Sequence, residues 1–321
     1  MPTKFRIHDL EVPAGAAGQR FDATLAALLP QYSRARLQRW ISAGAVLLEG
    51  RAVLPRQRLA GGEKVRVEAE FTADQRVGPE AMALRIVFED EALLVIDKPA
   101  GLVVHPGAGN PSHTLQNALL AHDGALSLVP RAGLIHRLDK DTSGLLVVAR
   151  TPECHTALVT MLQRRDIKRG YLALCLGTPT SGGTIDQPIG RHRSVRTRMA
   201  VRRDGREAVT HYRIEERFRG HTLLRVQLET GRTHQIRVHL AHAGFPIVGD
   251  GVYGGRRRQV AGATEALRVA LQSFRRQALH AQRLGLDHPL SGRHHTFEAP
   301  LPADFSSLLA ALRADLEQSS S

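Results

Sequence analysis

The sequence predicts an α+β protein of two domains: a small N-terminal domain at residues 18–70, a linker at 71–83 and a larger domain at 84–315. At roughly 150 residues per domain, the 321 residues of the chain make about two domains. Strand-like apolar runs outnumber helical ones and alternate irregularly with them, which favours a large mixed, mainly antiparallel sheet over repeated βαβ units. The linker lacks apolar periodicity and contains Gly78-Pro79, a loop marker.

The N-terminal domain shows two short helices followed by strands. The stretch RFDATLAALLP has helical apolar spacing and stops at a proline. Ser33 is a suitable N-cap for a second helix, in which Leu37, Trp40 and Ile41 share a face that we expect to be buried. Gly44 is suited to end this helix. The runs VLLEGRAV and EKVRVEAE are typical of short strands with glycine-containing turns.

The larger domain begins with two strand-like runs, RIVFE and ALLVID, and a helix, LQNALLAH, that Thr114 caps. Thr151 and Pro152 start a second helix that runs to about Arg165, since proline loses little at the first helical position. The segment THQIRVHLAHAG predicts a short helix that ends at Gly244, and ADFSSLLAALRADLEQ an amphipathic one. Further strands are predicted at LLVVA, YLALCLG, EAVTHYRIEERF and HTLLRVQLET.

Charge indicates the kind of partner. The chain has 44 Lys and Arg against 31 Asp and Glu, a formal net charge of +13, which is typical of proteins that bind a polyanion. No apolar run approaches the ~18 residues of a membrane span, and MPTKFRIHDLEVPAG lacks the apolar segment of a signal peptide. Cys154 and Cys175 form no CxxC pair, which fits a reducing, cytoplasmic location. We therefore expect a nucleic acid and no membrane.

The strongest candidate site is the loop HRLDKDTSG, which runs from His136 to Gly144 ahead of the apolar LLVVA. Two acids, Asp139 and Asp141, flank Lys140. A carboxylate beside Arg and Lys stays ionised because nearby cations lower its pKa, so it is suited to act as a nucleophile or a base. The same residues are also compatible with an ordinary turn that local ion pairs stabilise.

This loop, as HRLDKDTSGLLVVAR, resembles the active-site motif of the RluA-type pseudouridine synthases. Three further segments resemble motifs of that family, and all four occur in the family's order: DKPAGLVVHPG, YLALCLG and ETGRTHQIRVHLAHAGFPIVGD. The resemblance implies that the chain converts uridine in RNA to pseudouridine. This reaction breaks the N1–C1′ bond, turns the base and joins C5 to C1′. Because no atom enters or leaves, we expect no redox cofactor, nucleotide or metal.

The resemblance also implies residue roles. Asp139 matches the catalytic aspartate, and Tyr171 the tyrosine that stacks on a base turned out of the RNA. Arg237 matches the basic residue that pairs with this carboxylate, and we expect a bidentate pair. Arg137 matches the arginine that fills the gap left by the flipped nucleotide. Asp139 is able to attack C1′, attack C6 or remove the C2′ proton, three routes that stay open here. Asp141 is expected to stabilise the turn.

Two groups of arginines are candidates for RNA contacts. The stretch RFDATLAALLPQYSRARLQRWISAGAVLLEG resembles the S4 RNA-binding module, which implies that Arg34, Arg36 and Arg39 face RNA; a solvated helix face is the alternative. The stretch 191–206 holds seven arginines and one acid, and we expect a loop that follows phosphates. The candidates within it are Arg191, Arg193, Arg196 and Arg198, and the run of three arginines at 256–258 is a further one.

Other motifs are weaker. His234, His239 and His242 lie on one predicted helix, but the spacing of the first pair differs from that of a zinc-binding HExxH helix and the Glu is missing, so we predict no metal site. HRLD differs from the HRD loop of protein kinases by its Leu, and no Gly-rich loop accompanies it. GAGNPS lacks the Lys-Ser/Thr pair of a P-loop, so we expect no nucleotide cofactor.

The substrate follows from finer details. VHPGAGN, PRAGLIHRLDKDTSG, RTRMAV and VYGGR are most similar to family members that modify the large ribosomal subunit. The resemblance thus implies 23S rRNA, or the assembling large subunit, as the partner of a monomeric, cytoplasmic enzyme. The alternatives are a non-catalytic RNA-binding or ribosome-assembly factor and a sister synthase that acts on other rRNA positions or on tRNA. The intact Asp139, Tyr171 and Arg237 favour an enzyme.

Overall fold

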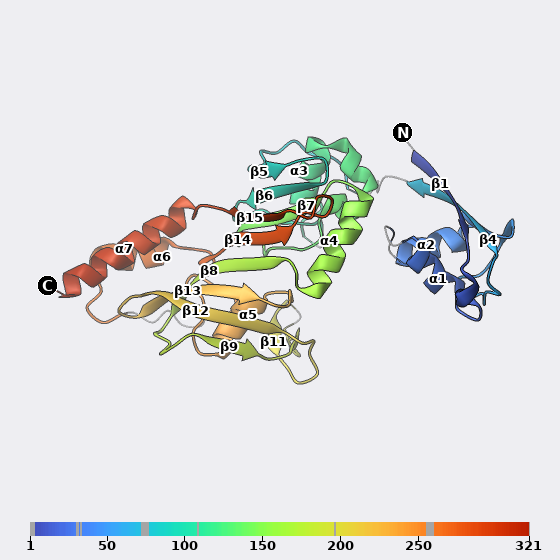
Figure 1. Cartoon of the computed structure of the whole chain (residues 1–321). Helices are drawn as coiled ribbons and strands as arrows, with labels where there is room; N and C mark the ends of the chain where they lie inside the picture. The colour runs from blue at the N-terminus through green and yellow to red at the C-terminus, as the bar shows by residue number, and fades with distance from the viewer. Residues whose placement is uncertain are drawn as a thin grey trace.

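The computed structural model describes residues 4–29, 32, 34–71, 77–107, 109–195, 197–254 and 260–320. Figure 1 shows two bodies, an N-terminal module of residues 4–71 in blue and a larger domain in teal to red. Each body has a hydrophobic core of its own, with Leu37 and Val67 in the first and Leu146 and Leu174 in the second. The predicted α+β class is confirmed. Ser33 lies outside the described residues.

The N-terminal module packs two helices on a small antiparallel sheet. Helices α1 (Phe21–Leu28) and α2 (Arg34–Ser42) bury Phe21, Leu37 and Ile41, and Gly44 takes the positive φ that ends the second helix. The described strands run in the order β1-β4-β2-β3. Their bounds are Lys4–Glu11 for β1, Val46–Leu48 for β2, Arg51–Ala52 for β3 and Lys64–Phe71 for β4.

Strand β1 and the turn after it were not predicted as part of this module. The strand pairs with β4 along its whole length, from Lys4 opposite Phe71 to Glu11 opposite Lys64. Val12 is buried in the same core as the helices. KFRIHDLE places polar residues beside apolar ones and leaves Ile7 56% exposed, so its apolar pattern is weak. A partner strand more than fifty residues later determines its conformation.

The larger domain contains a mixed sheet whose described strands follow the order β5-β6-β7-β14-β8-β13-β12-β9, with β15 paired to β14. Among the described strands, β7 and β14 make the one parallel pair, and the others are antiparallel. The bounds are Ile86–Glu89, Leu93–Lys98, Ser143–Ala149, Lys168–Leu176, Gly183–Asp186, Val209–Arg217, His221–Leu228, Leu279–Asp287 and His294–Glu298 for β5 to β9 and β12 to β15. The prediction of a mainly antiparallel sheet is confirmed.

Helices cover both faces of this sheet. On β6, Leu94 and Ile96 face one core and pack with α3 (Leu115–His122) and α5 (Gln235–His242), whereas Leu93 and Val95 face another and pack with α4 (Pro152–Arg164). A strand buried on both faces reads as a continuous apolar run, which is how LLVI appears in the sequence. The resulting three layers hold the central strands rigidly.

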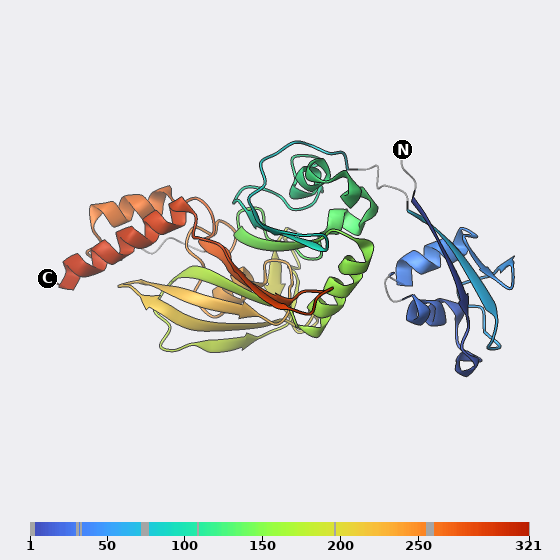
Figure 2. The same ribbon diagram turned by 45° about the horizontal axis from the view of Figure 1, so that its top comes forward.

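Two further helices lie at the end of the domain far from the N-terminal module. Figures 1 and 2 show α6 (Glu265–Ser273) and α7 (Ala303–Ser320) side by side, and Leu267, Phe305 and Leu312 join them to the main core. We did not predict α6, nor strands β9, β14 and β15. Within the described residues, no helix is long and apolar enough to cross a membrane.

Candidate active site

The site loop predicted from His136 to Gly144 ends at Thr142, and Ser143 and Gly144 begin β7. The amide of Thr142 donates to the carbonyl of Asp139 at 3.1 Å and closes a turn. Strand β7 is buried along its length, and Gly144 allows it to approach β14 closely: a Cβ there would lie 2.2 Å from the carbonyl oxygen of Ala281. The loop is therefore fixed to the centre of the sheet, as the apolar LLVVA predicts.

Lys98, which was not predicted as a site residue, holds the loop through a hydrogen bond to its backbone. Its buried Nζ donates to the carbonyls of Pro99 at 2.7 Å, Leu102 at 2.9 Å and Lys140 at 3.0 Å. Burial lowers the pKa of Lys98 to about 7, while Asp141 and Asp139 raise it. Three carbonyl acceptors use all three N–H bonds of the ammonium form, so these contacts bind the cation.

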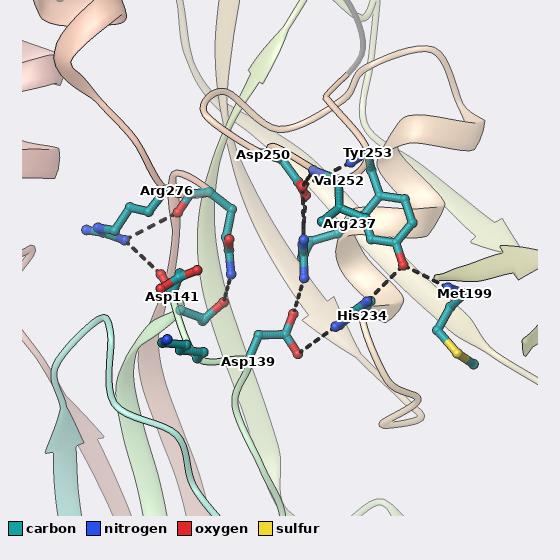
Figure 3. A network of polar contacts seen from close by, with 12 residues as sticks. Asp139, Asp141, Met199, His234, Arg237, Asp250, Val252, Tyr253 and Arg276 are labelled. Atoms are coloured by element: carbon teal, nitrogen blue, oxygen red, sulfur yellow. Dashed lines mark hydrogen bonds and ion pairs between the residues drawn. The ribbon is translucent and has the colours of Figure 1, made fainter. Parts of the chain in front are cut away.

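Arg237 joins Asp139 to a second acid. Its Nη1 donates to Oδ2 of Asp139 at 3.0 Å, while its Nε and Nη2 donate to the two carboxylate oxygens of Asp250 at 2.7 and 2.9 Å. The expected bidentate pair thus forms with Asp250, and Asp139 receives a single bond (Figure 3). Burial lowers the pKa of Arg237, but Asp250 and Asp139 outweigh burial and raise it. Arg237 is a cation held between two carboxylates.

Asp250 was not predicted although the quoted motif GFPIVGD contains it. Its carboxylate is fully buried and also accepts the amides of Val252 and Tyr253. Burial raises the pKa of Asp250, but Arg237 outweighs burial and lowers it. Gly249 before it has φ of +75°, and a Cβ there would lie 2.1 Å from a backbone oxygen. The sequence signal that could have indicated Asp250 is its place directly after Gly249, a glycine that the backbone conformation requires.

Tyr171 lies on β8 in the same pocket as Asp139. It is 6% exposed, and burial raises the pKa of its phenol, so the hydroxyl stays protonated at neutral pH. The structure thus brings together Asp139, Tyr171, Arg237 and Arg137, which all line a cavity of about 510 Å³.

Arginines dominate the wall of this cavity. The described lining residues include one acid, Asp139, and five arginines: Arg131, Arg137, Arg169, Arg232 and Arg237. Arg169 is 8% exposed, and its Nε is buried without a hydrogen-bond partner in the described part of the chain. A buried N–H without an acceptor is unfavourable until a ligand supplies one. The cavity therefore suits a polyanion.

Asp141, the second acid of the loop, contacts Arg276 through its backbone. Its backbone carbonyl accepts from Nη1 of Arg276 at 3.3 Å, and Figure 3 shows the two residues apart from the Asp139–Arg237 pair. Arg276 also forms a two-bond ion pair with Asp304 at the start of α7. Asp141 thus belongs to the support of the turn.

The predicted RNA-binding stretch 191–206 is a hairpin rather than a loop. Strands β10 (Ile189–Arg191) and β11 (Met199–Val201) pair antiparallel, with Arg191 opposite Met199. The turn between them carries Arg193 and Arg198, both exposed. The two strands were not predicted because each has three residues and the arginines of this stretch gave it no clear apolar pattern. Arg196 and residues 256–258 lie outside the described residues.

The three arginines of α2 differ in their surroundings. Arg34 donates two bonds to the buried carboxylate of Asp22, at 2.8 and 3.2 Å, although half of its side chain is exposed. The guanidinium of Arg36 lies 5.9 Å from the ring centre of Trp40. Arg39 is exposed. Arg34 therefore has a structural contact that the sequence analysis did not anticipate.

The histidines of α5 separate from one another. His239 is buried and lies within hydrogen-bond distance of the Thr210 hydroxyl and the Gln187 carbonyl, whereas His242 is exposed. His234 precedes the helix and lines the Asp139 pocket. Among the described residues, no three His, Cys, Asp or Glu side chains are grouped to hold a metal ion.

Comparisons with known proteins identify the family of the chain. The family model for RNA pseudouridylate synthase matches residues 92–242, and the S4 domain model matches residues 19–65. The chain is 54% identical over 98% of its length to the ribosomal large subunit pseudouridine synthase D of Xanthomonas campestris, of which it covers 95%. The protein of that name from Escherichia coli K12 is 53% identical over 94% of this chain and 93% of its own. The chain belongs to the RNA pseudouridylate synthase family.

Solved structures of this enzyme family align with about seven-tenths of the chain. The human RNA pseudouridylate synthase domain containing 4 aligns with a TM-score of 0.56 and 27% identity, over 71% of this chain and 93% of the human one. The human domain containing 1 gives a TM-score of 0.53 and 26% identity, over 72% and 95%. The chain is thus a pseudouridine synthase with an S4 domain ahead of its catalytic domain.

Proposed function

We propose that this pseudouridine synthase isomerises uridines in 23S rRNA, as free rRNA or in the assembling large subunit, with Asp139 as the catalytic residue. The observation that carries the proposal is the carboxylate of Asp139, held by buried Arg237 in a cavity whose other charged lining residues are arginines. The relatives at 53–54% identity bear the name of large-subunit enzymes, which supports the choice of rRNA.

The target nucleotide must leave the base stack to reach Asp139. A cavity of about 510 Å³ falls within the ~300–1,000 Å³ that small-ligand sites occupy, so it accommodates one nucleotide. Arg137 is exposed beside Asp139, and its planar guanidinium is suited to stack in the gap that the nucleotide leaves. Arg131 and Arg232 at the wall are suited to the flanking phosphates.

In the isomerisation, a C–N bond to C1′ is replaced by a C–C bond, and the uracil loses one proton at C5 and gains one at N1. The N1–C1′ bond breaks, the uracil turns within the pocket, C5 bonds to C1′, and the proton on C5 is lost while N1 gains one. Attack of Asp139 at C1′, attack at C6 and removal of the C2′ proton each need one lone pair of a carboxylate oxygen. Oδ2 accepts from Arg237, so one of the two lone pairs of Oδ1 serves that purpose. The protonated Tyr171 supports the uracil while it is detached.

Further RNA affinity comes from residues outside this pocket. The hairpin arginines Arg191, Arg193 and Arg198 and the exposed Arg39 of the S4 domain contact phosphates. Recognition of folded RNA relies more on shape than on base edges, so two basic surfaces on separate bodies place the target. The enzyme acts as a monomer in the cytoplasm.

Mapping of pseudouridines in defined RNAs tests the proposal. Purified wild type and Asp139→Asn are incubated with 23S rRNA, 16S rRNA and a tRNA pool, each transcribed without modification. We expect new pseudouridines at discrete positions of 23S rRNA with the wild type and none with the variant. Modification of the tRNA pool or of 16S rRNA alone contradicts the substrate, and equal activity of Asp139→Asn contradicts the catalytic residue.

A further inference from the structure

The imidazole of His234 faces the oxygen of Asp139 that Arg237 leaves free. Its Nε2 is 3.9 Å from Oδ1 of Asp139, while Oδ2 accepts from Arg237 at 3.0 Å. Figure 3 shows the carboxylate between these two side chains, which come from α5 and from the residue before it. The two oxygens of Asp139 therefore have different neighbours.

Tyr253 determines which nitrogen of His234 carries the hydrogen. The amide of Met199 donates to Oη of Tyr253 at 2.9 Å, and Oη is 2.8 Å from Nδ1 of His234. Donation of the single hydroxyl hydrogen to Nδ1 satisfies both groups. Burial lowers the pKa of His234 although Asp139 raises it, so the ring is neutral at pH 7, and in this arrangement its one N–H is on Nε2, toward Asp139.

The backbone of His234 is held in an unfavourable conformation to place the ring there. Its φ is +57° and its ψ 22°, the left-handed region, which costs about 1–3 kcal/mol for a residue other than glycine. The surroundings that hold it include a small cluster in which Val238 of α5 packs with Met199 and Tyr253. Strain of this kind collects at functional sites. Strand β11, helix α5 and the residues around His234 thus pack together.

We propose that His234 is a positioning residue for Asp139: with RNA bound, its Nε2–H donates to Oδ1 and, together with Arg237, fixes the plane of the carboxylate. Tyr253 keeps the hydrogen on Nε2. The distance of 3.9 Å exceeds that of a hydrogen bond, and hydrogen bonds at active sites often shorten only in the complex. This inference rests on the proposed catalytic role of Asp139.

The first test separates positioning from binding. A displacement of about 1 Å at a reacting group slows a reaction by up to ~10²-fold, so His234→Ala should lower the single-turnover rate at saturating RNA by roughly 10- to 100-fold. The dissociation constant for the same RNA should stay within about twofold of the wild type, because His234 is not a cationic phosphate contact. A rate equal to the wild type, or a loss confined to affinity, overturns the proposal.

The second test asks whether the N–H and the hydroxyl act together. Tyr253→Phe should slow the reaction less than His234→Ala, and the double variant should be no slower than His234→Ala, since the hydroxyl acts through the imidazole. His234→Gln supplies an oxygen that accepts from Tyr253 and an N–H that donates to Asp139, so it should recover most of the rate. Additive losses, or a Gln variant as slow as Ala, overturn the proposal.

Matched controls come from the same elements. His242→Ala removes an exposed histidine from the end of α5, and Tyr212→Phe removes the hydroxyl of a half-buried tyrosine on β12. Both should leave the rate unchanged. If His234→Ala does not fold, the Gln and Phe variants decide the matter by the criteria above. A wild type inactive on every RNA refutes the proposed function, whereas an active wild type with an unaffected His234→Ala refutes this inference alone.

Discussion

Two regions of the chain, the α1–α2 contact of the N-terminal module and the wall of the catalytic pocket, use arginine in opposite ways. In the N-terminal module, Arg20 and Arg34 donate to the buried carboxylate of Asp22, and the bonds of Arg34 join α1 to α2. In the catalytic pocket, Arg131 and Arg137 donate to no acceptor within the described part of the chain. A closed internal ion pair stabilises a fold, whereas an arginine without a protein acceptor in a pocket is available to a ligand. The density of arginines in the sequence does not distinguish these uses.

Asp22 shows how strong the internal contacts are. Burial raises the pKa of its carboxyl, but hydrogen bonds from Arg34, Gln38 and Arg20 outweigh burial and hold that pKa at about 2. Arg237 plays the same part for Asp250 in the catalytic domain, yet it keeps one N–H for Asp139. The difference between these two ion-pair clusters is therefore one donated bond from Arg237 to Asp139, a carboxylate that lines a cavity.

Asp139→Asn is expected to have the largest effect, because it should abolish catalysis in one body without changing the RNA affinity that arginines of both bodies supply. The amide is nearly isosteric but is neither a nucleophile nor a base, so the single-turnover rate should fall by at least about 10³-fold. RNA affinity, which the other arginines supply, should be unchanged. Turnover is measured from pseudouridine formation and affinity by filter binding. A residual rate within about tenfold of the wild type contradicts the assignment.

Arg237→Ala extends the comparison to stability. It leaves Asp250 buried without its partner, and the loss of one member of a buried ion pair typically costs about 3–5 kcal/mol of unfolding free energy. Lysine should restore only part of the loss, because it lacks the planar fork that reaches both acids. Urea unfolding of the three proteins measures the loss, and activity at saturating RNA should fall with it. Full activity and stability in the Ala variant would refute the role of Arg237.

Much of this site was predictable from local sequence. Asp139, Tyr171 and Arg237 lie in motifs whose apolar flanks also predict the elements that carry them, and the structure places all three in one cavity. The residues that were missed act through contacts distant in sequence. Lys98 binds the carbonyl of Lys140, and Tyr253 receives the amide of Met199. Nothing in the neighbourhood of either residue in the chain shows that partner.

The secondary structure shows the same division between elements that local sequence predicts and elements that depend on distant partners. Helices α3 and α4 were predicted with their caps because Thr114 and Thr151 accept from amides three residues later. Strands β1 and β14 were missed because their conformation depends on partners far away in the chain. The bidentate pair of Arg237 was assigned to the wrong acid, since two carboxylates compete for one guanidinium only in three dimensions.

Acid should destabilise the two bodies at different pH. Burial lowers the pKa of His136 to about 3 and that of His155 to about 4, so between pH 6.5 and these values the unfolded chain binds more protons and the catalytic domain loses stability as pH falls. Each group contributes up to about 1.4 kcal/mol per pH unit. For Asp22 the pKa falls from 3.8 to about 2, so its contribution is lost only between these two values.

The single Trp40 lies in the core of the N-terminal module and reports on that body alone. In a urea series from pH 7 to 4.5, far-UV circular dichroism should show a falling midpoint for the catalytic domain, while the midpoint from Trp40 fluorescence changes less. His136→Gln should reduce the pH dependence, and His242→Gln, at an exposed position, should not. Parallel shifts of both midpoints would contradict the separation.

The smallest expected effects distinguish two arginines of one helix. Arg34→Ala removes two bonds to Asp22 but leaves Arg20 and Gln38 as its donors, so the module should lose about 1–2 kcal/mol of unfolding free energy, read from Trp40. Arg39→Ala should leave that stability within about 0.5 kcal/mol, because the side chain is exposed. It should instead weaken RNA binding and reduce the slope of log affinity against log salt by about 0.7–0.9. Titrations at several salt concentrations measure the slope, and saturating RNA should restore turnover because Asp139 is unchanged. If Arg39→Ala leaves the slope unaltered, this helix face contacts solvent and not RNA.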